Sequence, residues 1–319
     1  MQHNILGKTG IEVSELCYGA LPIGPLQANF TVPKAAEVIR YCLEQGINFI
    51  DTAQRYETYE HIQTALRGYD KPVVIASKSW SASYEDMRKA VEEARAKLDR
   101  DTIDIFHLHA ARVNKDVFEV RCGALEYLCE AKAKGHIKAV GISTHSVPIV
   151  RLAAEKPEID VIHPLVNLLG LGILEGSLAE MIEAITYAGQ QGKGIYLMKA
   201  MAGGHLADRY QEAIDFSRGI PGVASIAIGM LSREEADANI AHVEGRQIDE
   251  ATKSRIGKKG KKLFVLDQCK ACGICVEKCP NGALTVQGPR AQADPERCIL
   301  CGYCVPYCPQ FSLRLINAE

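Results

Sequence analysis

Residues 269–280 read CKACGICVEKCP, and residues 298–309 repeat the pattern as CILCGYCVPYCP. Each run places three cysteines within seven residues and adds a fourth directly before a proline. This spacing is typical of [4Fe–4S] binding, in which the fourth cysteine of each run serves the cluster held by the other run. The stretch therefore predicts two clusters in a small fold with a pseudo-twofold repeat.

Because the fourth cysteine of each run serves the cluster of the other run, the eight cysteines divide into two sets of ligands. The first set, which we call site I, consists of Cys269, Cys272, Cys275 and Cys308. The second set, site II, consists of Cys298, Cys301, Cys304 and Cys279. The segment resembles the bacterial two-cluster ferredoxins over about residues 264–319.

The sequence gives less support to two other uses of these cysteines, zinc binding and disulfide formation. Zinc ribbons also use paired Cys-x2-Cys, but a tetrahedral site needs two such pairs, and the third cysteine of each run would be surplus. A disulfide framework needs an oxidising compartment, and the sequence does not indicate one. Both the spacing and its repetition favour iron–sulfur clusters.

Composition limits the remaining possibilities. The chain has 319 residues, of which 47% are hydrophobic and 24% charged, enough for one large globular domain and a smaller one. The first ten residues lack the apolar core of a secretory signal, and the longest apolar run, 161–174, is too short to span a bilayer, so we expect a cytoplasmic protein. The net charge of −2 gives no reason to expect a nucleic-acid or membrane partner.

The first three quarters of the chain alternate short apolar runs with segments of helical periodicity. We expect strands at residues 16–20, 48–52, 73–77, 103–109, 138–142, 161–166, 194–199 and 224–228, and the clearest helices at residues 34–45, 84–98, 178–189 and 233–243. This alternation predicts an α/β fold, a closed (β/α)8 TIM barrel, with a hairpin at residues 4–14 on its N-terminal face. An open doubly wound sheet is the alternative, weakened because no Gly-x-Gly-x-x-Gly follows a strand.

Reactive side chains gather where neighbouring strands of this barrel should end. Asp51 closes the second strand and Tyr56 follows it, while Lys78 and His109 close the next two. Chemistry in such barrels sits at the carboxyl ends of the strands. Each residue alone has a structural explanation, but four of them at matched strand ends favour a catalytic site.

The motifs around these residues resemble those of the aldo-keto reductases. Residues 46–60 read Gly-(x)3-Ile-Asp-Thr-Ala-x2-Tyr-x3-Glu, and the fourth strand carries Asp104-x4-His109. The likeness continues through Gly141-Ile142-Ser143 and Gly229 to Asn239, so it covers about residues 5–245. With the cysteine runs behind it, the chain resembles the branch of that family with a C-terminal two-cluster ferredoxin domain.

The resemblance implies reduction of a carbonyl group by hydride from a nicotinamide cofactor. Tyr56 would then donate a proton to the carbonyl oxygen, with the charge of Lys78 stabilising its phenolate. Asp51 would hold Lys78 charged, and His109 would hydrogen-bond the carbonyl oxygen. His107 lies deeper on the same strand face, and we interpret it as a core histidine.

The resemblance also assigns nucleotide-binding positions, although several residues differ from the family pattern. Ser143 and Thr144 stand where the family has Ser-Asn, His163 stands for Gln, and Lys199 stands for a stacking Tyr. Gly229 to Asn239 keeps the spacing of the adenosine loop. Within it, Met230 and Glu235 replace the usual Ser and Arg, Glu235 would repel the 2′-phosphate of NADP, and Arg233 is the nearby cation that could replace the Arg.

We therefore expect a barrel at residues 1–245, a basic linker at 246–263, and a small α+β ferredoxin-like domain at 264–319. Residues 253–262 are rich in Lys and Arg without an acid, which indicates either a solvated linker or a docking strip for an acidic electron carrier such as ferredoxin or flavodoxin. The expected cofactors are two [4Fe–4S] clusters and NADP or NAD.

A hydride carries two electrons, whereas each cluster passes one at a time, so a bridging group such as a flavin is possible, although no flavin motif is readable. We expect the ferredoxin domain to pack against the C-terminal face of the barrel and to cover the site, because it follows the last barrel helix. The alternatives are a cluster-fed reductase of a small molecule that binds no nicotinamide, and a noncatalytic electron-transfer or redox-sensing protein.

Overall fold

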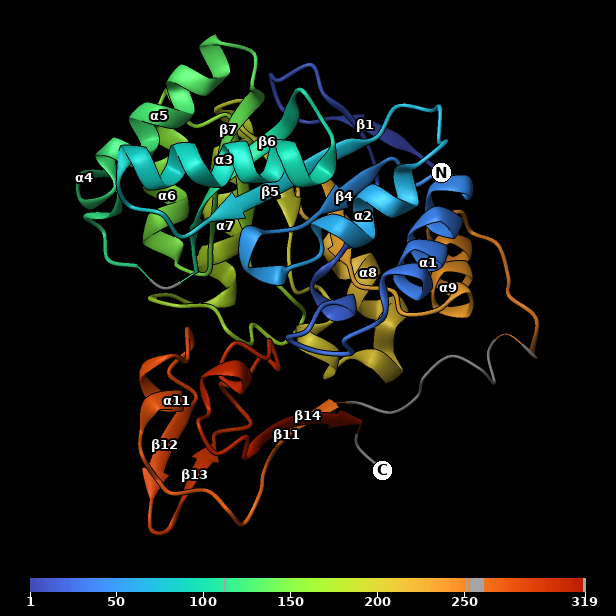
Figure 1. Ribbon diagram of the computed structural model, residues 1–319. Helices are drawn as coiled ribbons and strands as arrows, with labels where there is room; N and C mark the ends of the chain where they lie inside the picture. The colour runs from blue at the N-terminus through green and yellow to red at the C-terminus, as the bar shows by residue number, and fades with distance from the viewer. Residues whose placement is uncertain (112, 251, 253–260, 318–319) are drawn as a thin grey trace.

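The computed structural model describes residues 1–111, 113–250, 252 and 261–317, and it contains a closed barrel with a smaller domain below it (Figure 1). The barrel strands are all parallel and follow one another in chain order around the ring. They are β3 (Leu16–Gly19), β4 (Phe49–Asp51), β5 (Val74–Ser79), β6 (Ile103–Ala110), β7 (Ile137–Thr144), β8 (Val161–Pro164), β9 (Gly194–Leu197) and β10 (Val223–Ile228). The ring closes between β10 and β3, which confirms the TIM barrel and excludes the open sheet.

Helices surround this ring on its outer side, as Figure 1 shows. They are α1 (Val32–Glu44), α2 (Tyr59–Leu66), α3 (Tyr84–Leu98), α4 (Val117–Val120), α5 (Cys122–Ala133), α6 (Val147–Glu155), α7 (Leu178–Gln190), α8 (Tyr210–Arg218) and α9 (Arg233–Val243). Three of them begin at a serine whose hydroxyl accepts a backbone N–H of the first turn, namely Ser83, Ser177 and Ser232. Such caps satisfy N–H groups that have no partner within the helix, which explains why α3 and α9 begin and end at the predicted residues.

The N-terminal hairpin consists of β1 (His3–Ile5) and β2 (Glu12–Ser14), paired antiparallel as predicted. Beside it, Leu6 and Val13 pack on Cys17 and Phe49 inside the barrel. The start of β9 approaches so closely that a Cβ on Gly194 would lie 2.6 Å from the Leu6 side chain. The hairpin therefore closes the N-terminal end of the barrel, and the open end lies opposite.

The register of the parallel strands aligns the predicted site residues at that open end. Lys78 of β5 pairs with His107 of β6. One step further along, His109 pairs with Ser143 of β7, which in turn pairs with His163 of β8. Because parallel strands end on one face, these side chains form rows around the same opening.

The C-terminal domain is built from two short antiparallel pairs of strands. Strand β11 (Lys261–Val265) pairs with β14 (Leu313–Asn317), and β12 (Leu284–Gln287) pairs with β13 (Arg290–Ala293), while α11 (Ile274–Glu277) carries part of the first cysteine run. Residues 261–263, which the sequence placed in the linker, form the start of β11. Residues 253–260, the main part of the predicted basic strip, lie outside the described residues.

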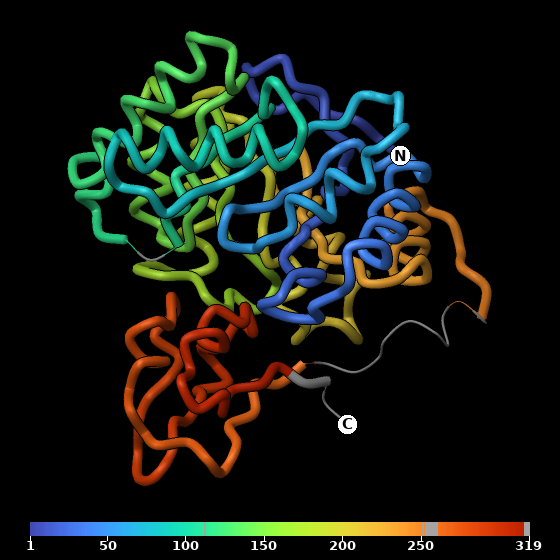
Figure 2. The backbone as a smooth tube through the Cα atoms, viewed as in Figure 1, coloured from blue at the N-terminus to red at the C-terminus, as the bar shows by residue number. Residues whose placement is uncertain are grey.

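The smaller domain lies at the end of the barrel opposite the hairpin (Figures 1 and 2). Its position agrees with the prediction that it packs on the C-terminal face. None of the helices that the structure describes is long and apolar enough to cross a bilayer.

Candidate functional site

An ion pair between Lys78 and Asp51 lies at the centre of the C-terminal face. The Lys78 ammonium donates to both Asp51 carboxylate oxygens, at 2.6 and 2.7 Å, and to the backbone carbonyl of Thr52 at 2.7 Å. Both side chains are almost fully buried. Burial lowers the pKa of Lys78, and the Asp51 carboxylate opposes this shift. All three protons of the ammonium are therefore used within the barrel.

Tyr56 lies beside this pair on the 3₁₀ turn Gln54–Tyr56, with its ring centroid 5.0 Å from the Lys78 ammonium. Burial raises the pKa of Tyr56 well above 10, and the neighbouring Tyr303 and Asp51 raise it further. This differs from the expectation that Lys78 lowers this pKa. The reason is that Lys78 donates its hydrogen bonds to Asp51 and Thr52, and its ammonium approaches the ring face of Tyr56.

His109 and Tyr56 both approach the hydroxyl of Tyr303, a residue of the smaller domain. The Tyr303 hydroxyl lies 3.3 Å from His109 Nε2 and 3.5 Å from the Tyr56 hydroxyl. Trp80, which follows strand β5, packs edge-on against the His109 and Tyr303 rings at centroid distances of 5.5 and 5.7 Å. Burial and the charge of Lys78 lower the pKa of His109 well below 6.5, so its imidazole is neutral near pH 7.

A buried hydrogen-bond network extends from Asp51 across the barrel interior. The Tyr196 hydroxyl donates to Asp51 Oδ2 at 2.8 Å and lies 2.7 Å from His107 Nε2. His163 stacks on the Tyr196 ring at 3.8 Å, and its Nδ1 lies 2.7 Å from the Tyr196 carbonyl oxygen, which makes Nδ1 the donor. His107 is fully buried, as expected of a core histidine, but it also connects through Tyr196 to Asp51.

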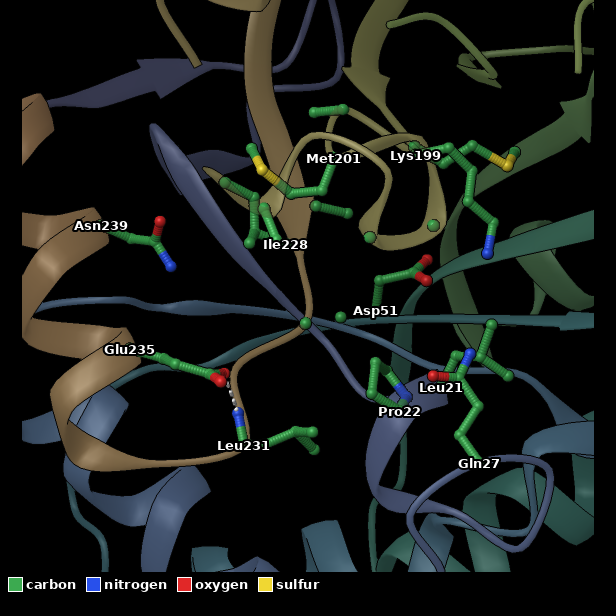
Figure 3. A pocket seen from close by; sticks show the side chains of 18 of the residues that line it. Leu21, Pro22, Gln27, Asp51, Lys199, Met201, Ile228, Leu231, Glu235 and Asn239 are labelled. Carbon is green, nitrogen blue, oxygen red and sulfur yellow. Dashed lines mark hydrogen bonds between the residues drawn. The ribbon is translucent and has the colours of Figure 1, made fainter. Parts of the chain in front are cut away.

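An elongated cavity of about 230 Å³ begins at Asp51 and Tyr56 and extends toward the N-terminus of α9 (Figure 3). Four of the predicted nucleotide-binding residues line it, namely His163, Lys199, Gly229 and Asn239. The Glu235 carboxylate also faces it and accepts the backbone N–H of Leu231 at 2.8 Å. Because Tyr56 and Asn239 both line it, an extended ligand in this cavity could contact both residues.

Three other predicted nucleotide-binding residues do not line this cavity. Arg233 pairs with Glu37 of α1 at 2.7 Å, and its guanidinium lies over the Tyr41 ring. The Thr144 hydroxyl accepts the backbone N–H of Ser146 at 3.2 Å. The Ser143 hydroxyl is buried and has no hydrogen-bond partner among the described residues. Because an unpaired buried hydroxyl is costly, Ser143 remains a candidate to bind a ligand atom.

The cysteines of the smaller domain surround two separate cavities. One is lined by all four residues of site II, Cys279, Cys298, Cys301 and Cys304. The other is lined by all four residues of site I, Cys269, Cys272, Cys275 and Cys308. Each cavity thus contains the last cysteine of the opposite run, the arrangement that crossed ligation requires. The donor set and its grouping fit two clusters.

Site II is the nearer of the two to the barrel. Cys301 packs in one apolar cluster with Leu21, Ala53, Tyr56 and Tyr303. The loop between Cys301 and Cys304 consists of Gly302 and Tyr303, and a Cβ on Gly302 would lie 2.2 Å from the Leu26 carbonyl oxygen. Only a glycine allows this close approach, so the site II loop fits tightly against the barrel.

Comparison with family models now identifies the two parts of the chain. Residues 15–223 match the model of the aldo/keto reductase family. The chain belongs to this family. Residues 268–312 match the model of a 4Fe-4S dicluster domain, so the aldo/keto reductase barrel is joined to an iron–sulfur domain of ferredoxin type. The second match also favours clusters over the zinc and disulfide alternatives.

Relatives of this aldo/keto reductase include two named oxidoreductases. The L-galactose dehydrogenase of Arabidopsis thaliana is 21% identical over 79% of this chain and 92% of its own length. The aldo-keto reductase YhdN of Bacillus subtilis is 28% identical over 53% of this chain and 54% of its own length. These relatives make the chain an oxidoreductase and leave its substrate open.

Solved structures show the same barrel. A protein described as an aldo-keto reductase of Pseudomonas aeruginosa superposes with a TM-score of 0.64 and 28% identity, covering 76% of this chain and 94% of its own. The holo form of an aldo-keto reductase from Bacillus halodurans has a TM-score of 0.65 at 21% identity, covering 81% of this chain and 96% of its own. The second likeness concerns the fold alone.

The sequence missed three residues that shape the site of this aldo/keto reductase. Tyr196 lies within an apolar strand, where a tyrosine is expected to pack in the core rather than to take part in a site. Trp80 follows β5, and it is the single tryptophan of the chain. Tyr303 lies between the ligand cysteines Cys301 and Cys304, and the cysteine pattern assigns it no role. Its position inside a ligand loop, where Gly302 and an aromatic residue stand next to each other, is the signal that could have indicated a contact.

Proposed function

We propose that this aldo/keto reductase reduces the carbonyl group of a small molecule between Tyr56 and His109, with a nicotinamide dinucleotide bound in the adjoining cavity. One observation carries the proposal. The Tyr303 hydroxyl lies 3.5 Å from the Tyr56 hydroxyl and 3.3 Å from His109 Nε2, so the Tyr303 oxygen marks a point that both barrel residues can reach. A carbonyl oxygen at that point would meet a proton donor and a neutral imidazole.

In this proposal Tyr56 supplies the proton. A bound nicotinamide supplies hydride, that is, a proton with two electrons, to the carbonyl carbon. The Tyr56 hydroxyl gives its proton to the oxygen, so the product is an alcohol, and water then returns a proton to the tyrosine. The raised pKa keeps Tyr56 protonated before the reaction. The Lys78 ammonium, 5.0 Å from the Tyr56 ring centroid, would face the phenolate that forms.

His109 and the Asp51 network position the reactants. The neutral imidazole of His109 can hydrogen-bond the carbonyl oxygen without competing for the proton of Tyr56. Tyr196 and Lys78 together occupy both oxygens of Asp51, which holds the carboxylate rigidly at the end of the cavity. Trp80 forms one wall of the space that the substrate would occupy.

The substrate must displace the side chain of Tyr303. The cavity extends along the nucleotide side of Tyr56, whereas His109, Trp80 and Tyr303 do not line it. Tyr303 therefore fills the space between Tyr56 and His109 when the two domains are docked as described. We propose that the site II loop closes the substrate side and withdraws when a carbonyl compound binds.

The cavity favours NADH over NADPH. Glu235 stands at the end of the cavity near Asn239, as Figure 3 shows, and Arg233 is turned away to Glu37. A carboxylate accepts hydrogen bonds from the ribose hydroxyls of NADH, whereas it repels the additional phosphate of NADPH.

A second candidate is reduction by electrons delivered through site II. Tyr303 belongs to a site II ligand loop and also contacts Tyr56 and His109, so site II is adjacent to the proposed substrate position. Two single electrons and two protons would then reduce the same carbonyl, with an acidic ferredoxin or flavodoxin as the electron donor. This route needs no dinucleotide in the cavity.

Isotope transfer separates the candidates. Anaerobic protein with intact clusters is mixed with NADH deuterated at both C4 positions and a panel of aldehydes and ketones, and the alcohols are analysed by mass spectrometry. Deuterium on the carbinol carbon supports hydride transfer. An alcohol without deuterium, formed also from dithionite-reduced protein lacking nucleotide, supports the electron route. No product under either condition contradicts both and favours the noncatalytic alternative.

A further inference from the structure

Two lysines from different domains face the same cavity. Lys199 follows strand β9 of the barrel, and its side chain points into the cavity on the side of Asp51 (Figure 3). Lys261 is the first residue of β11 in the iron–sulfur domain and also lines the cavity. Burial lowers the pKa of each, and the Lys199 ammonium lowers the pKa of Lys261 further by repulsion. The cavity therefore has a cationic side chain from each domain in its lining.

The acidic residues of the cavity do not pair with these lysines. Asp51 is bonded to Lys78 and Tyr196, and Glu235 accepts the Leu231 N–H. Lys261 donates to the neutral side-chain amide oxygen of Gln27 at 2.7 Å. Among the described residues, no carboxylate lies within ion-pair distance of the Lys199 ammonium. A partly desolvated ammonium without an ion-pair partner is unfavourable, so a bound anion would stabilise both groups.

The backbone of Lys199 gives a second reason to regard its side chain as functional. Lys199 has a φ of +63°, a left-handed conformation that costs a residue with a Cβ about 1 kcal/mol and would cost glycine almost nothing. Its long cationic side chain extends into the cavity. Strained residues of this kind cluster at ligand sites.

We propose that Lys199 and Lys261 form an anion-binding subsite, shared by the two domains, that takes a phosphate or carboxylate group of the ligand in the cavity. This subsite rests on the proposed function only because both use the same cavity. Binding of an anion can be tested without any turnover. A bound anion would touch the barrel through Lys199 and the iron–sulfur domain through Lys261. Ligand binding would thereby hold the domains together while the loop of Tyr303 moves.

Two sources could supply the anion, the pyrophosphate of a dinucleotide or a carboxylate of the substrate. The probes are therefore inorganic pyrophosphate, NADH and pyruvate, titrated calorimetrically into the full-length protein with intact clusters under anaerobic conditions. The variants are Lys199→Met and Lys261→Met. The matched control is Lys262→Met, because Lys262 is the next residue of the same strand and is exposed to solvent.

We expect at least one probe to bind the wild type and to bind each of the two variants about ten- to one-hundredfold more weakly, because each loses a charge-assisted hydrogen bond. The Lys262→Met control should match the wild type, and Lys261→Arg should restore most of the affinity. Weakening of pyrophosphate and NADH assigns the subsite to the dinucleotide. Weakening of pyruvate alone assigns it to a substrate carboxylate.

The competing explanation is that Lys199 serves as a counter-charge to site II, because the Cys301 thiolate raises the pKa of Lys199. In that case Lys199→Met would shift the reduction potential of the site II cluster and leave the affinity for all three probes unchanged. That result, or a wild type that binds none of the probes, overturns the subsite. Tyr56→Phe should bind the same anions as the wild type, so a failure of the proposed reduction would not affect this test.

Discussion

The hydroxyl of Tyr303 lies 3.3 Å from Nε2 of His109, although the two residues are 194 positions apart and belong to different domains. The same hydroxyl is 3.5 Å from that of Tyr56. Tyr303 belongs to a loop that carries site II ligands, and its side chain contacts both Tyr56 and His109. An iron–sulfur domain that only carried electrons past the barrel would not require this contact. In the proposed site, a substrate between Tyr56 and His109 would therefore require the site II loop to move.

Removal of the Tyr303 hydroxyl should therefore help the substrate to bind. In Tyr303→Phe the carbonyl oxygen no longer competes with a phenol for Tyr56 and His109, so KM should fall by about two- to tenfold, the worth of one hydrogen bond. We expect kcat to change less than threefold or so. The check is steady-state reduction of the carbonyl substrate found with the wild type. Tyr307→Phe in the same domain is the control. A loss of kcat as large as that of Tyr56→Phe would make Tyr303 part of the proton transfer instead.

Tyr56→Phe should remove turnover with little effect on binding. The substitution deletes the proton donor and preserves the ring that packs against Leu21, Ala53 and Cys301. We expect kcat to fall by about 10² or more and the dinucleotide affinity to stay within a factor of about two. Tyr187→Phe, on the outer surface of α7, controls for loss of a tyrosine hydroxyl. Equal kcat values for wild type and Tyr56→Phe would mean that the chain has the fold of the family but does not use the proposed mechanism.

The crossed cysteine sets predict which cluster a substitution damages. Cys279 follows the first run but lines the cavity of site II, so Cys279→Ser should impair the cluster of Cys298, Cys301 and Cys304. Iron analysis should fall from about eight to about four atoms per chain, and the site I signal should persist in electron paramagnetic resonance spectra. Cys122→Ser, an exposed cysteine outside both sets, is the control. Retention of the site II signal with loss of site I would refute the crossed assignment.

Stability should fall as the pH drops below about 6.5. Burial lowers the pKa of four histidines, that of His145 to about 3, so they stay neutral in the folded chain. The unfolded chain, in which each has a pKa of about 6.5, binds more protons below that pH. Each histidine then lowers the free energy of unfolding by up to about 1.4 kcal/mol per pH unit.

The measurement is the unfolding midpoint of the full-length protein at pH 7.5 and at pH 5.5 under anaerobic conditions. His145→Gln should reduce the difference between the two midpoints, because one of the buried histidines is removed. The exposed His3→Gln is the matched control and should leave the difference unchanged. Midpoints that are the same at both pH values would contradict the assignment of these histidines as neutral in the folded state.

Glu235 should decide between the two nicotinamide dinucleotides. Glu235→Gln keeps an oxygen that can accept the Leu231 N–H and removes the negative charge from the cavity. The affinity for NADPH should rise about tenfold, because a repulsion with the 2′-phosphate is lost, while that for NADH should fall slightly. Glu234→Gln, one residue earlier on α9, serves as the control. An unchanged ratio of the two affinities would place the 2′-position away from Glu235.

The sequence alone determined the features that depend on neighbours along the chain. Cysteine spacing predicts the two sets because each run must wrap one corner of a cluster, and its fourth member, before a proline, turns away. Alternation of apolar and helical segments predicts the barrel and the bounds of α3 and α9, whose serine caps in the structure are satisfied within one turn. Asp51, Lys78 and His109 could be placed together because parallel strands end on one face.

Only the tertiary structure decided how these parts meet. Tyr196 bonds to Asp51 across 145 residues, and Tyr303 reaches His109 across a domain boundary. No local periodicity encodes such contacts, because they depend on which faces pack and at what distance. The same holds for the direction of the pKa of Tyr56. The sequence places a lysine beside this phenol, but burial and the hydrogen bonds of Lys78 to Asp51 and Thr52 decide which influence is larger.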